Sequence, residues 1–450
     1  MTQSNYQPAN TLKSAFKACG VEPLEPSEME RYYVDLSAVR KTSAIDSVST
    51  ILEFQEPAEF CTILFTGHRG CGKSTELKRI QQQWSEDYRI IYLEVNEETD
   101  INDAQYIDFY LIIIKRVEFE LRKIGLKLDD KLLKSFESWF KDVTKENEET
   151  VEKSVSIEGE ATLSPEAPFL AKLMVKLLAQ IKGSDKQKTT IRETLEKDLS
   201  RLKADINLLL GDAYNKLRGK FPQCKGLLII FDNLDRIPLK ISNHLFFDYA
   251  AQLQELDCTI IYTVPIYALC SPNNLLNQFE GNPHIVPMVN IYEFERDVCD
   301  LNYNQIGVDA IASVIEKRVD IDAVFESRSV LLDMAKASGG HVRQLMQLMR
   351  TACQTASTKK HSKIMAEDAT YAINQLQFSF ERSIPEAHYP FLAEVCLTKD
   401  VSKDQEGQLM LFNTSVLEYN GDKRWNYLNP LVRRNEFFKQ FLETILAEKS

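Results

Sequence analysis

The chain has 450 residues, of which 44% are hydrophobic and 27% charged, and its formal net charge is −12 at pH 7. This length permits two or three domains, and the composition is ordinary for a globular protein. No segment approaches the roughly 20 apolar residues of a membrane span, because the apolar run 110–114 is followed by Lys115 and Arg116. An acidic chain needs a local basic patch to bind nucleic acid.

The nine cysteines and six histidines are scattered, and no two cysteines form a C-x-x-C pair. This spacing argues against a zinc site and against a disulfide framework. The first ten residues are polar and lack the apolar stretch of a secretory signal. We therefore expect a cytoplasmic protein without a membrane segment.

Residues 1–28 are expected to form a weakly structured N-terminal tail, whose acidic stretch is punctuated by Pro23 and Pro26. The following stretch, 31–36, predicts either a short strand or a segment that contacts a nucleotide base. A helix is expected over 43–52. From residue 29 to about 300 we expect one α/β domain with a parallel sheet, because strand-like and helix-like segments alternate.

Residues 67–75 read Gly-His-Arg-Gly-Cys-Gly-Lys-Ser-Thr, which matches the phosphate-binding P-loop pattern G-x-x-x-x-G-K-S. Its glycines let backbone N–H groups turn toward a polyphosphate. Lys73 can reach the β- and γ-phosphates, and the Ser74 hydroxyl can coordinate Mg²⁺. A predicted strand over 60–66 precedes the loop, and a predicted helix over 74–83 follows it. The predicted nucleotide site comprises Gly67, His68, Arg69, Gly70, Cys71, Gly72, Lys73, Ser74 and Thr75.

The next predicted strand covers 88–95 and is apolar enough to be internal. A large helical insertion is expected between about 101 and 222. It contains predicted helices over 107–124, 169–181 and 190–218 and a polar, mostly acidic linker over 141–160.

A buried strand over 226–232 ends in Asp232, which places this carboxylate at the carboxyl edge of the sheet. There it can hold Mg²⁺ through water, whereas the alternative is an aspartate that caps a turn. Many hydrolytic P-loop ATPases carry a glutamate at the next position, but this chain has Asn233, which cannot take a proton. Asp235 is the best remaining candidate for the base, and a surface ion pair with Arg236 is an equally good interpretation.

Another buried strand is predicted over 258–265, and a third over 284–291. Thr263 could sense the γ-phosphate at the end of its strand, or its hydroxyl could bond to its own backbone. Residues 301–380 predict a helical lid. Within it, Gly339 and Gly340 precede a helix that carries Arg343. Arg343 could reach the γ-phosphate and so couple the lid to the nucleotide, or it could be a solvent-exposed arginine at a helix start.

Residues 381–450 predict a winged-helix domain: two helices, a hairpin with an Asn420-Gly421 turn, and a final helix. The basic residues near the hairpin are offset by acidic ones, so a DNA-binding face is only weakly indicated. We expect the hairpin to pack against the lid. The basic residues are Lys423, Arg424, Arg433 and Arg434, and the acidic residues that offset them are Glu418, Asp422 and Glu436.

The order of these motifs resembles the AAA+/STAND group of P-loop ATPases, including origin-recognition-like members, over roughly residues 30–445. The segment 232–236 is also similar to the KAP and NACHT pattern. This resemblance implies ATP and Mg²⁺ as cofactors, catalytic roles for Lys73, Asp232, Asp235 and Arg343, and Ser74 and Asp232 as metal ligands. In related ATPases the region of Tyr33 and Arg40 contacts the base.

The resemblance implies an ATP-hydrolysing switch, in a prokaryotic signalling or anti-phage defence pathway, that acts with a partner effector and can form a homo-oligomer. No arginine occurs between residues 265 and 287, where AAA+ proteins commonly carry an arginine finger. This favours a regulated switch, with slow or partner-dependent hydrolysis, over a ring-shaped motor. The alternatives are a DNA-binding ATPase of the origin-recognition or transposition-regulator type and a nucleotide-binding scaffold that scarcely hydrolyses.

Overall fold

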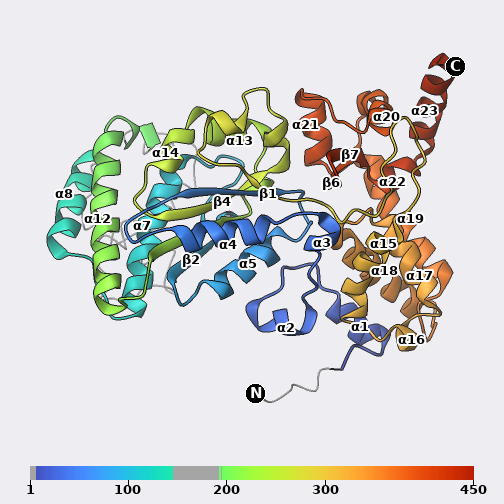
Figure 1. Cartoon of the computed structure of the whole chain (residues 1–450), viewed down its shortest axis with the longest axis horizontal. Coiled ribbons are helices and arrows are strands. Elements are labelled where there is room, and N and C mark those ends of the chain that lie inside the picture. The colour runs from blue at the N-terminus through green and yellow to red at the C-terminus, as the bar shows by residue number, and fades with distance from the viewer. Residues whose placement is uncertain (1–6, 145–191, 194, 450) are drawn as a thin grey trace.

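The computed structural model describes residues 7–144, 192–193 and 195–449. The predicted helix over 169–181, most of the predicted linker over 141–160 and the start of the predicted helix over 190–218 lie outside the described residues. A five-stranded parallel sheet forms the centre of the molecule, with the strand order β2-β3-β4-β1-β5 (Figure 1). Its strands are β1 (Thr62–Gly67), β2 (Tyr88–Glu94), β3 (Gly226–Asp232), β4 (Thr259–Pro265) and β5 (His284–Val286).

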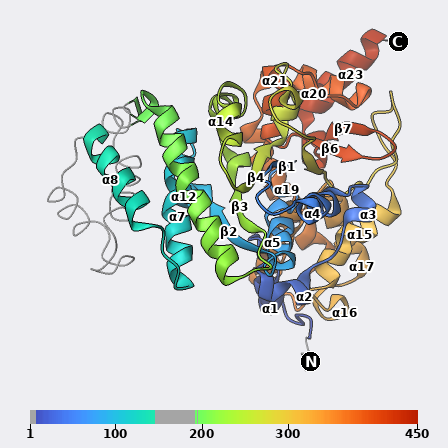
Figure 2. The ribbon, with the colours of Figure 1, turned by 60° about the vertical axis from the view of Figure 1, so that its left-hand side comes forward.

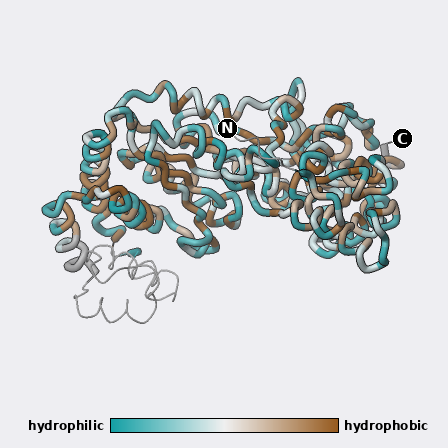
Figure 3. The backbone as a smooth tube through the Cα atoms, turned by 90° about the horizontal axis from the view of Figure 1, so that it is seen from below, coloured by the Kyte–Doolittle hydropathy of each residue, from teal (hydrophilic) through white to brown (hydrophobic). Residues whose placement is uncertain are grey.

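The expected α/β class and parallel sheet are confirmed, although β5 is shorter than the predicted strand over 284–291. β3 and β4 are buried along their whole length, as expected for strands with helices on both faces of a parallel sheet. One face packs against α4 (Ala44–Phe54) and α5 (Lys73–Gln83). Figure 3 shows hydrophobic stretches both in the centre of the molecule and in its right-hand end, interspersed with hydrophilic segments.

The other face of the sheet packs against the helical insertion, which forms one end of the molecule (Figures 1 and 2). Within this insertion, the Arg192 guanidinium pairs with the buried carboxylate of Asp108 and, at 2.7 Å, with the partly exposed carboxylate of Asp103. The helices of this side are α6 (Val95–Glu98), α7 (Tyr106–Lys123), α8 (Asp130–Thr144), α12 (Leu199–Lys220), α13 (Leu239–Asn243) and α14 (Ala250–Gln254).

The prediction of a weakly structured tail is wrong for the described residues from 7 to 28. Helix α1 (Leu12–Ala18) packs on α18 (Val342–Thr358), and Ala15 and Cys19 are fully buried. Arg350 of α18 lies over the Phe16 ring, 3.8 Å from its centroid. These apolar residues anchor the segment despite its prolines. The predicted strand at 31–36 is also absent, since α2 (Met29–Tyr32) and α3 (Ser37–Arg40) flank an irregular stretch.

The lid helices and the C-terminal region (384–449) form the opposite end of the molecule (Figure 1). The predicted helix–helix–hairpin–helix order of the C-terminal region is present, with a two-stranded antiparallel sheet. Within the described part of the chain, no helix is long and apolar enough to cross a membrane. The lid comprises α15 (Gln305–Glu316), α16 (Ile321–Val324), α17 (Arg328–Ala337), α18 and α19 (Ala366–Ser383), and the C-terminal region α20 (Tyr389–Thr398), α21 (Gln405–Phe412), β6 (Val416–Asn420), β7 (Arg424–Leu428), α22 (Pro430–Arg433) and α23 (Glu436–Lys449).

Candidate functional site: a nucleotide cleft

A cleft that is partly open to solvent lies at the start of α5, bordered by α18 and by the N-terminal segment. Nine predicted site residues line it: Arg69, Gly70, Cys71, Gly72, Lys73, Ser74, Thr75, Asp235 and Arg343. Four others do not line it: Gly67, His68, Asp232 and Thr263. The fold therefore brings most of the predicted site together around one cavity.

The P-loop backbone has the shape that a phosphate cradle requires. Gly70 and Gly72 have φ values of 86° and 112°, in the left-handed region where a side chain is unfavourable. A Cβ atom at Gly70 would lie 2.4 Å from Cε1 of His341. Gly72 precedes α5, an 11-residue helix whose N-terminus opens into the cleft. Backbone N–H groups at such a helix start favour an anion.

Lys73 is buried and fully engaged in this structure. Its ammonium group donates to the carbonyls of Gly67 and His68, each at 2.8 Å, and pairs with Asp235 at 2.8 Å. Burial acts to lower the pKa of Lys73, but the Asp235 carboxylate outweighs it and raises this pKa. Burial likewise acts to raise the pKa of Asp235, and Lys73 holds that pKa below its usual value. Asp235 thus forms an ion pair, with Lys73 and not with the expected Arg236.

Asp232 lies at the end of β3 with both carboxylate oxygens engaged. One accepts from the Tyr92 hydroxyl and the other from the Asn233 N–H, each at 2.7 Å. Asn233 has a left-handed backbone (φ 69°), and its side-chain amide donates to Glu94 at 3.2 Å. The turn places Asp235 in the cleft and leaves Asp232 behind it. The carboxylate of Asp232 and the hydroxyl of Ser74 are oxygen donors of the kind that Mg²⁺ prefers, so the donor set fits this ion.

Thr263 does not face the cleft. Its hydroxyl donates to the carbonyl of Phe231 at 3.0 Å and accepts from the N–H of Leu234 at 2.9 Å. Both partners belong to β3 and its following turn, and not to the backbone of Thr263 itself. Because the buried hydroxyl is satisfied on both sides, this residue fixes the turn that carries Asp235 and does not contact a phosphate. Both interpretations of Thr263 from the sequence, a sensor of the γ-phosphate and a hydroxyl bonded to its own backbone, therefore differ from the observed contacts.

Three arginines surround the phosphate end of the cleft. Arg69, Arg236 and Arg343 all line it, and within the described residues none of their guanidinium groups has a carboxylate within 4.0 Å. Burial lowers the pKa of Arg343, and the positive charges of Arg236 and Arg69 lower it further. This cluster of positive charge suits an anionic ligand. From the sequence, Arg236 is expected only in an ion pair, although its position beside Asp235 was a usable signal.

The lid contacts the P-loop directly. The backbone N–H of Arg343 donates to the Gly70 carbonyl at 3.2 Å. His341 caps the start of α18, where its Nδ1 accepts from the Gln344 N–H at 3.3 Å. The start of α18, which was predicted to follow Gly339-Gly340, thus contacts the phosphate-binding loop.

The other end of the cleft is formed by residues upstream of the P-loop. Tyr33 and Arg40, expected near the base, both line the cleft. The Tyr33 hydroxyl donates to Glu76 at 3.1 Å, and the Arg40 guanidinium donates to the Cys71 carbonyl. Residues 20–24 also line the cleft, and the Leu24 N–H donates to Thr75 Oγ1 at 3.2 Å. No local pattern in the sequence indicates this last contact.

The C-terminal region is docked on the same loop. Helix α21 packs on the turn 266–270 that follows β4, where the rings of Phe412 and Tyr267 lie 5.6 Å apart. The Glu418 N–H of β6 donates to Nε2 of His68 at 2.8 Å. The Tyr419 hydroxyl donates to the Gly339 carbonyl at 2.7 Å, and its ring stacks on Trp425. The expected packing of the hairpin on the lid is therefore observed.

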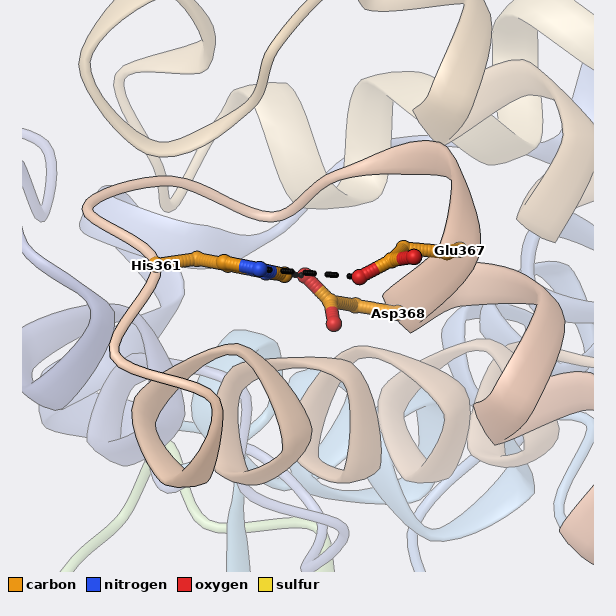
Figure 4. A group of neighbouring side chains, drawn as sticks. All are labelled: His361, Glu367 and Asp368. Carbon is orange, nitrogen blue, oxygen red and sulfur yellow. Dashed lines mark hydrogen bonds and ion pairs between the residues drawn. The ribbon is translucent and has the colours of Figure 1, made fainter.

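A separate group of possible metal ligands lies at the start of α19, where Figure 4 shows His361, Glu367 and Asp368 facing one another. His361 Nδ1 lies 2.8 Å from Asp368, which also accepts from the Met365 N–H. The Lys359 ammonium lies 3.0 Å from Glu367 and 3.4 Å from Asp368. The lysine supplies the positive charge here, so this group is an ion-pair network that begins a helix.

Residues 42–250 match the family described as the KAP family P-loop domain. Comparison with curated proteins gave no match. Similar solved structures include the ORC2 protein of Aeropyrum pernix in ADPNP–ADP complexes, with 13% identity and a TM-score of 0.38, covering 99% of this chain and 98% of that one. The Drosophila ORC bound to DNA has 10% identity and a TM-score of 0.39, with 98% and 95% coverage.

A third similar structure is the Thermotoga maritima RuvB Holliday junction branch migration motor, with 11% identity, a TM-score of 0.36, and 90% and 95% coverage. The KAP match spans the P-loop, the strand that ends in Asp232 and the helical insertion between them. The resemblance expected from segment 232–236 is thereby confirmed, because residues 42–250, somewhat less than half of the chain, are similar to the KAP family P-loop domain.

Proposed function

We propose that this protein binds ATP with Mg²⁺ and acts as a switch whose C-terminal region is held on the P-loop domain until nucleotide changes the loop. The observation that carries this proposal is the docking of β6 on His68, a residue of the P-loop itself. Because the loop and the hairpin are in direct contact, a ligand that changes the loop acts on the hairpin without an intervening element.

In the proposed bound state, Lys73 leaves Asp235 and pairs with the β- and γ-phosphates, while the backbone of 67–75 cradles them. Ser74 holds Mg²⁺ directly and Asp232 holds it through water. Arg343 and Arg236 neutralise the γ-phosphate, and Arg69 lies nearest to solvent among the three. A guanidinium favours the triphosphate over the diphosphate because the γ-phosphate adds charge.

Hydrolysis is assigned to Asp235, which becomes available as a base only after Lys73 has moved away. On this proposal, turnover is slow or depends on a partner, because no glutamate stands at position 233. On the resemblance to STAND ATPases, we place the switch in a prokaryotic signalling or anti-phage defence pathway in the cytoplasm. In the switched state, the protein then acts on a partner effector or assembles into a homo-oligomer.

The alternative of a DNA-binding ATPase has less support. Arg433 is paired with Asp300 and lies over the Tyr427 ring. Arg434 donates to Gln377 and Asn374 of α19. The basic residues that would contact DNA are thus engaged within the protein, and α21 and the hairpin are covered by the P-loop domain.

Nucleotide binding is tested by titration calorimetry of the full chain with Mg·ATP and Mg·ADP. Wild type and Lys131→Ala, a control at an exposed lysine of α8, are expected to bind both. Lys73→Ala is expected to bind Mg·ATP at least about tenfold more weakly, since it loses a charged contact to phosphate. Equal binding by Lys73→Ala and wild type would contradict the proposed site.

A further inference from the structure

Arg40 is a buried arginine that contacts the backbone of the P-loop. It is 3% exposed and borders the nucleotide cleft. Its Nη2 donates to the carbonyl of Cys71, and a Cβ atom at Gly72 would lie 3.8 Å from the same nitrogen. The guanidinium therefore lies against the peptide that joins Cys71 to Gly72, although the resemblance to related ATPases predicts that this region contacts the base.

This contact fixes the direction of the Gly72 N–H. No peptide bond among the described residues is cis, and in a trans peptide the carbonyl and the following N–H point in opposite directions. Because Arg40 holds the Cys71 carbonyl, the N–H of Gly72 points away from Arg40. In the described part of the chain this N–H has no backbone acceptor, so it is available to a phosphate oxygen.

The residue type at position 72 makes this external contact important. Gly72 has a φ of 112°, and a glycine populates positive and negative φ values about equally well. The peptide before it is therefore less restrained by local sterics than other peptides. If this peptide rotated, the Cys71 carbonyl would replace the Gly72 N–H and would repel a phosphate. A charged donor on that carbonyl opposes such a rotation, because hydrogen bonds with an ionised partner are the stronger ones.

Arg40 is itself held in place by its surroundings. Its Nη1 lies 3.9 Å from the buried carboxylate of Glu76, which also pairs with Arg79 at 3.7 Å. Two residues after Arg40, the Thr42 hydroxyl donates to the carbonyl of Ile285 in β5 at 2.7 Å. The guanidinium is thus supported by α5 on one side and by the edge of the sheet on the other.

We infer that Arg40 is a positioning residue that orients the Cys71–Gly72 peptide so that the Gly72 N–H can bind a phosphate. This inference rests on the proposed function and names a residue on which its phosphate cradle depends. It differs from a base contact in one measurable respect. A residue that orients the loop affects every ligand that carries phosphates, whereas a residue that contacts the base affects only ligands that carry a base.

The test is titration calorimetry of the full chain with Mg·ADP, together with magnesium pyrophosphate as a competitor that has no base or sugar. Arg40→Met keeps the length of the side chain without its donors, and Arg40→Lys keeps the charge and a donor. Arg79→Met is the matched control, because Arg79 shares Glu76 with Arg40 but does not contact the Cys71 carbonyl. Thermal unfolding shows whether each variant is folded. If Arg40→Met is not, the double variant Arg40→Met/Glu76→Gln replaces it, since it leaves no charge of that pair buried alone.

Arg40→Met is expected to weaken the binding of Mg·ADP and of pyrophosphate by a similar factor, at least about tenfold. Arg40→Lys should lose less, and Arg79→Met should change either affinity by less than about threefold. A loss confined to Mg·ADP would place Arg40 on the base or the sugar and would overturn the inference alone, as would unchanged affinity for both ligands. Wild type that binds neither ligand would overturn the proposed function with it.

Discussion

The two faces of the sheet are packed in different ways. On the insertion face, the apolar core contains only residues of the sheet, the insertion and the segments that follow β3 and β4. On the P-loop face, one continuous core runs through the sheet, the N-terminal segment, the lid and the C-terminal region. Among the described residues, the N-terminal segment therefore packs with the lid and the C-terminal region only on the second face.

The polar contacts of the two faces differ accordingly. On the insertion face, the buried charges of Arg192 and Asp108 pair with each other, and no ligand is needed to satisfy them. On the P-loop face, Lys73 and Asp235 are paired only while no phosphate competes, and three arginines have no carboxylate partner among the described residues. We conclude that the insertion face provides a fixed support and that the P-loop face holds the adjustable contacts.

The largest effect is expected from breaking the fixed support. Arg192→Met leaves the carboxylate of Asp108 buried without its partner, which should lower the free energy of unfolding by about 4 kcal/mol. Nucleotide should not restore it, because the pair lies away from the cleft. Urea unfolding with and without Mg·ADP measures this, and Arg201→Ala, at a partly exposed pair on α12, is the control with a change below about 1 kcal/mol. A loss that Mg·ADP reverses would contradict the distinction between the faces.

The next effect concerns the adjustable pair. Asp235→Asn leaves Lys73 buried without a counter-charge, so the nucleotide-free protein should lose about 3 kcal/mol of stability. In contrast to Arg192→Met, Mg·ADP should recover much of this loss, because its phosphates provide the missing charge. Thermal unfolding at several nucleotide concentrations gives the comparison, with Asp46→Asn on α4 as a surface control. An equal loss with and without Mg·ADP would show that Lys73 does not move to the phosphates.

The sequence predicted the contiguous parts of this arrangement and missed the contacts between distant segments. The strands, the P-loop and the helix that begins beside Arg343 depend on neighbouring residues, and their patterns are visible locally. The ion-pair interpretation of Asp235 named Arg236, which is adjacent in sequence, whereas the observed partner, Lys73, is adjacent only in the fold. His68 was assigned to the phosphate like its neighbours, since nothing in the loop sequence indicates that its ring turns toward Glu418. The N-terminal segment was missed because its order depends on α18.

A smaller effect is expected from acidification of the P-loop face. Burial, together with the Lys73 ammonium, lowers the pKa of His68 to about 3. Burial, together with the Arg343 guanidinium, lowers the pKa of His341 to about 3. Because the unfolded chain binds protons near pH 6.5 and the folded chain does not, stability falls as the pH drops below that value.

Between pH 7 and pH 5 each histidine should reduce the free energy of unfolding by about 2 kcal/mol. Urea unfolding at both pH values measures this dependence. His68→Gln should remove about one half of the part due to the two histidines, whereas His284→Gln should remove less. An unchanged pH dependence in His68→Gln would indicate that His68 becomes protonated without leaving its site.

The smallest expected effect separates binding from turnover at the arginines. Arg236→Ala removes one guanidinium from the phosphate end, while Arg69 and Arg343 remain. We expect ATP turnover to fall about tenfold, roughly 1.4 kcal/mol in the barrier, with a smaller change in Mg·ADP affinity, because the γ-phosphate is the group that this arginine would neutralise. Arg236→Lys should recover part of the rate, and Arg382→Ala, at an exposed arginine near the end of α19, should have no effect. A fall in Mg·ADP affinity as large as the fall in turnover would place Arg236 at the β-phosphate instead. The P-loop face would then distinguish bound nucleotide from its absence, but it would not distinguish ATP from ADP.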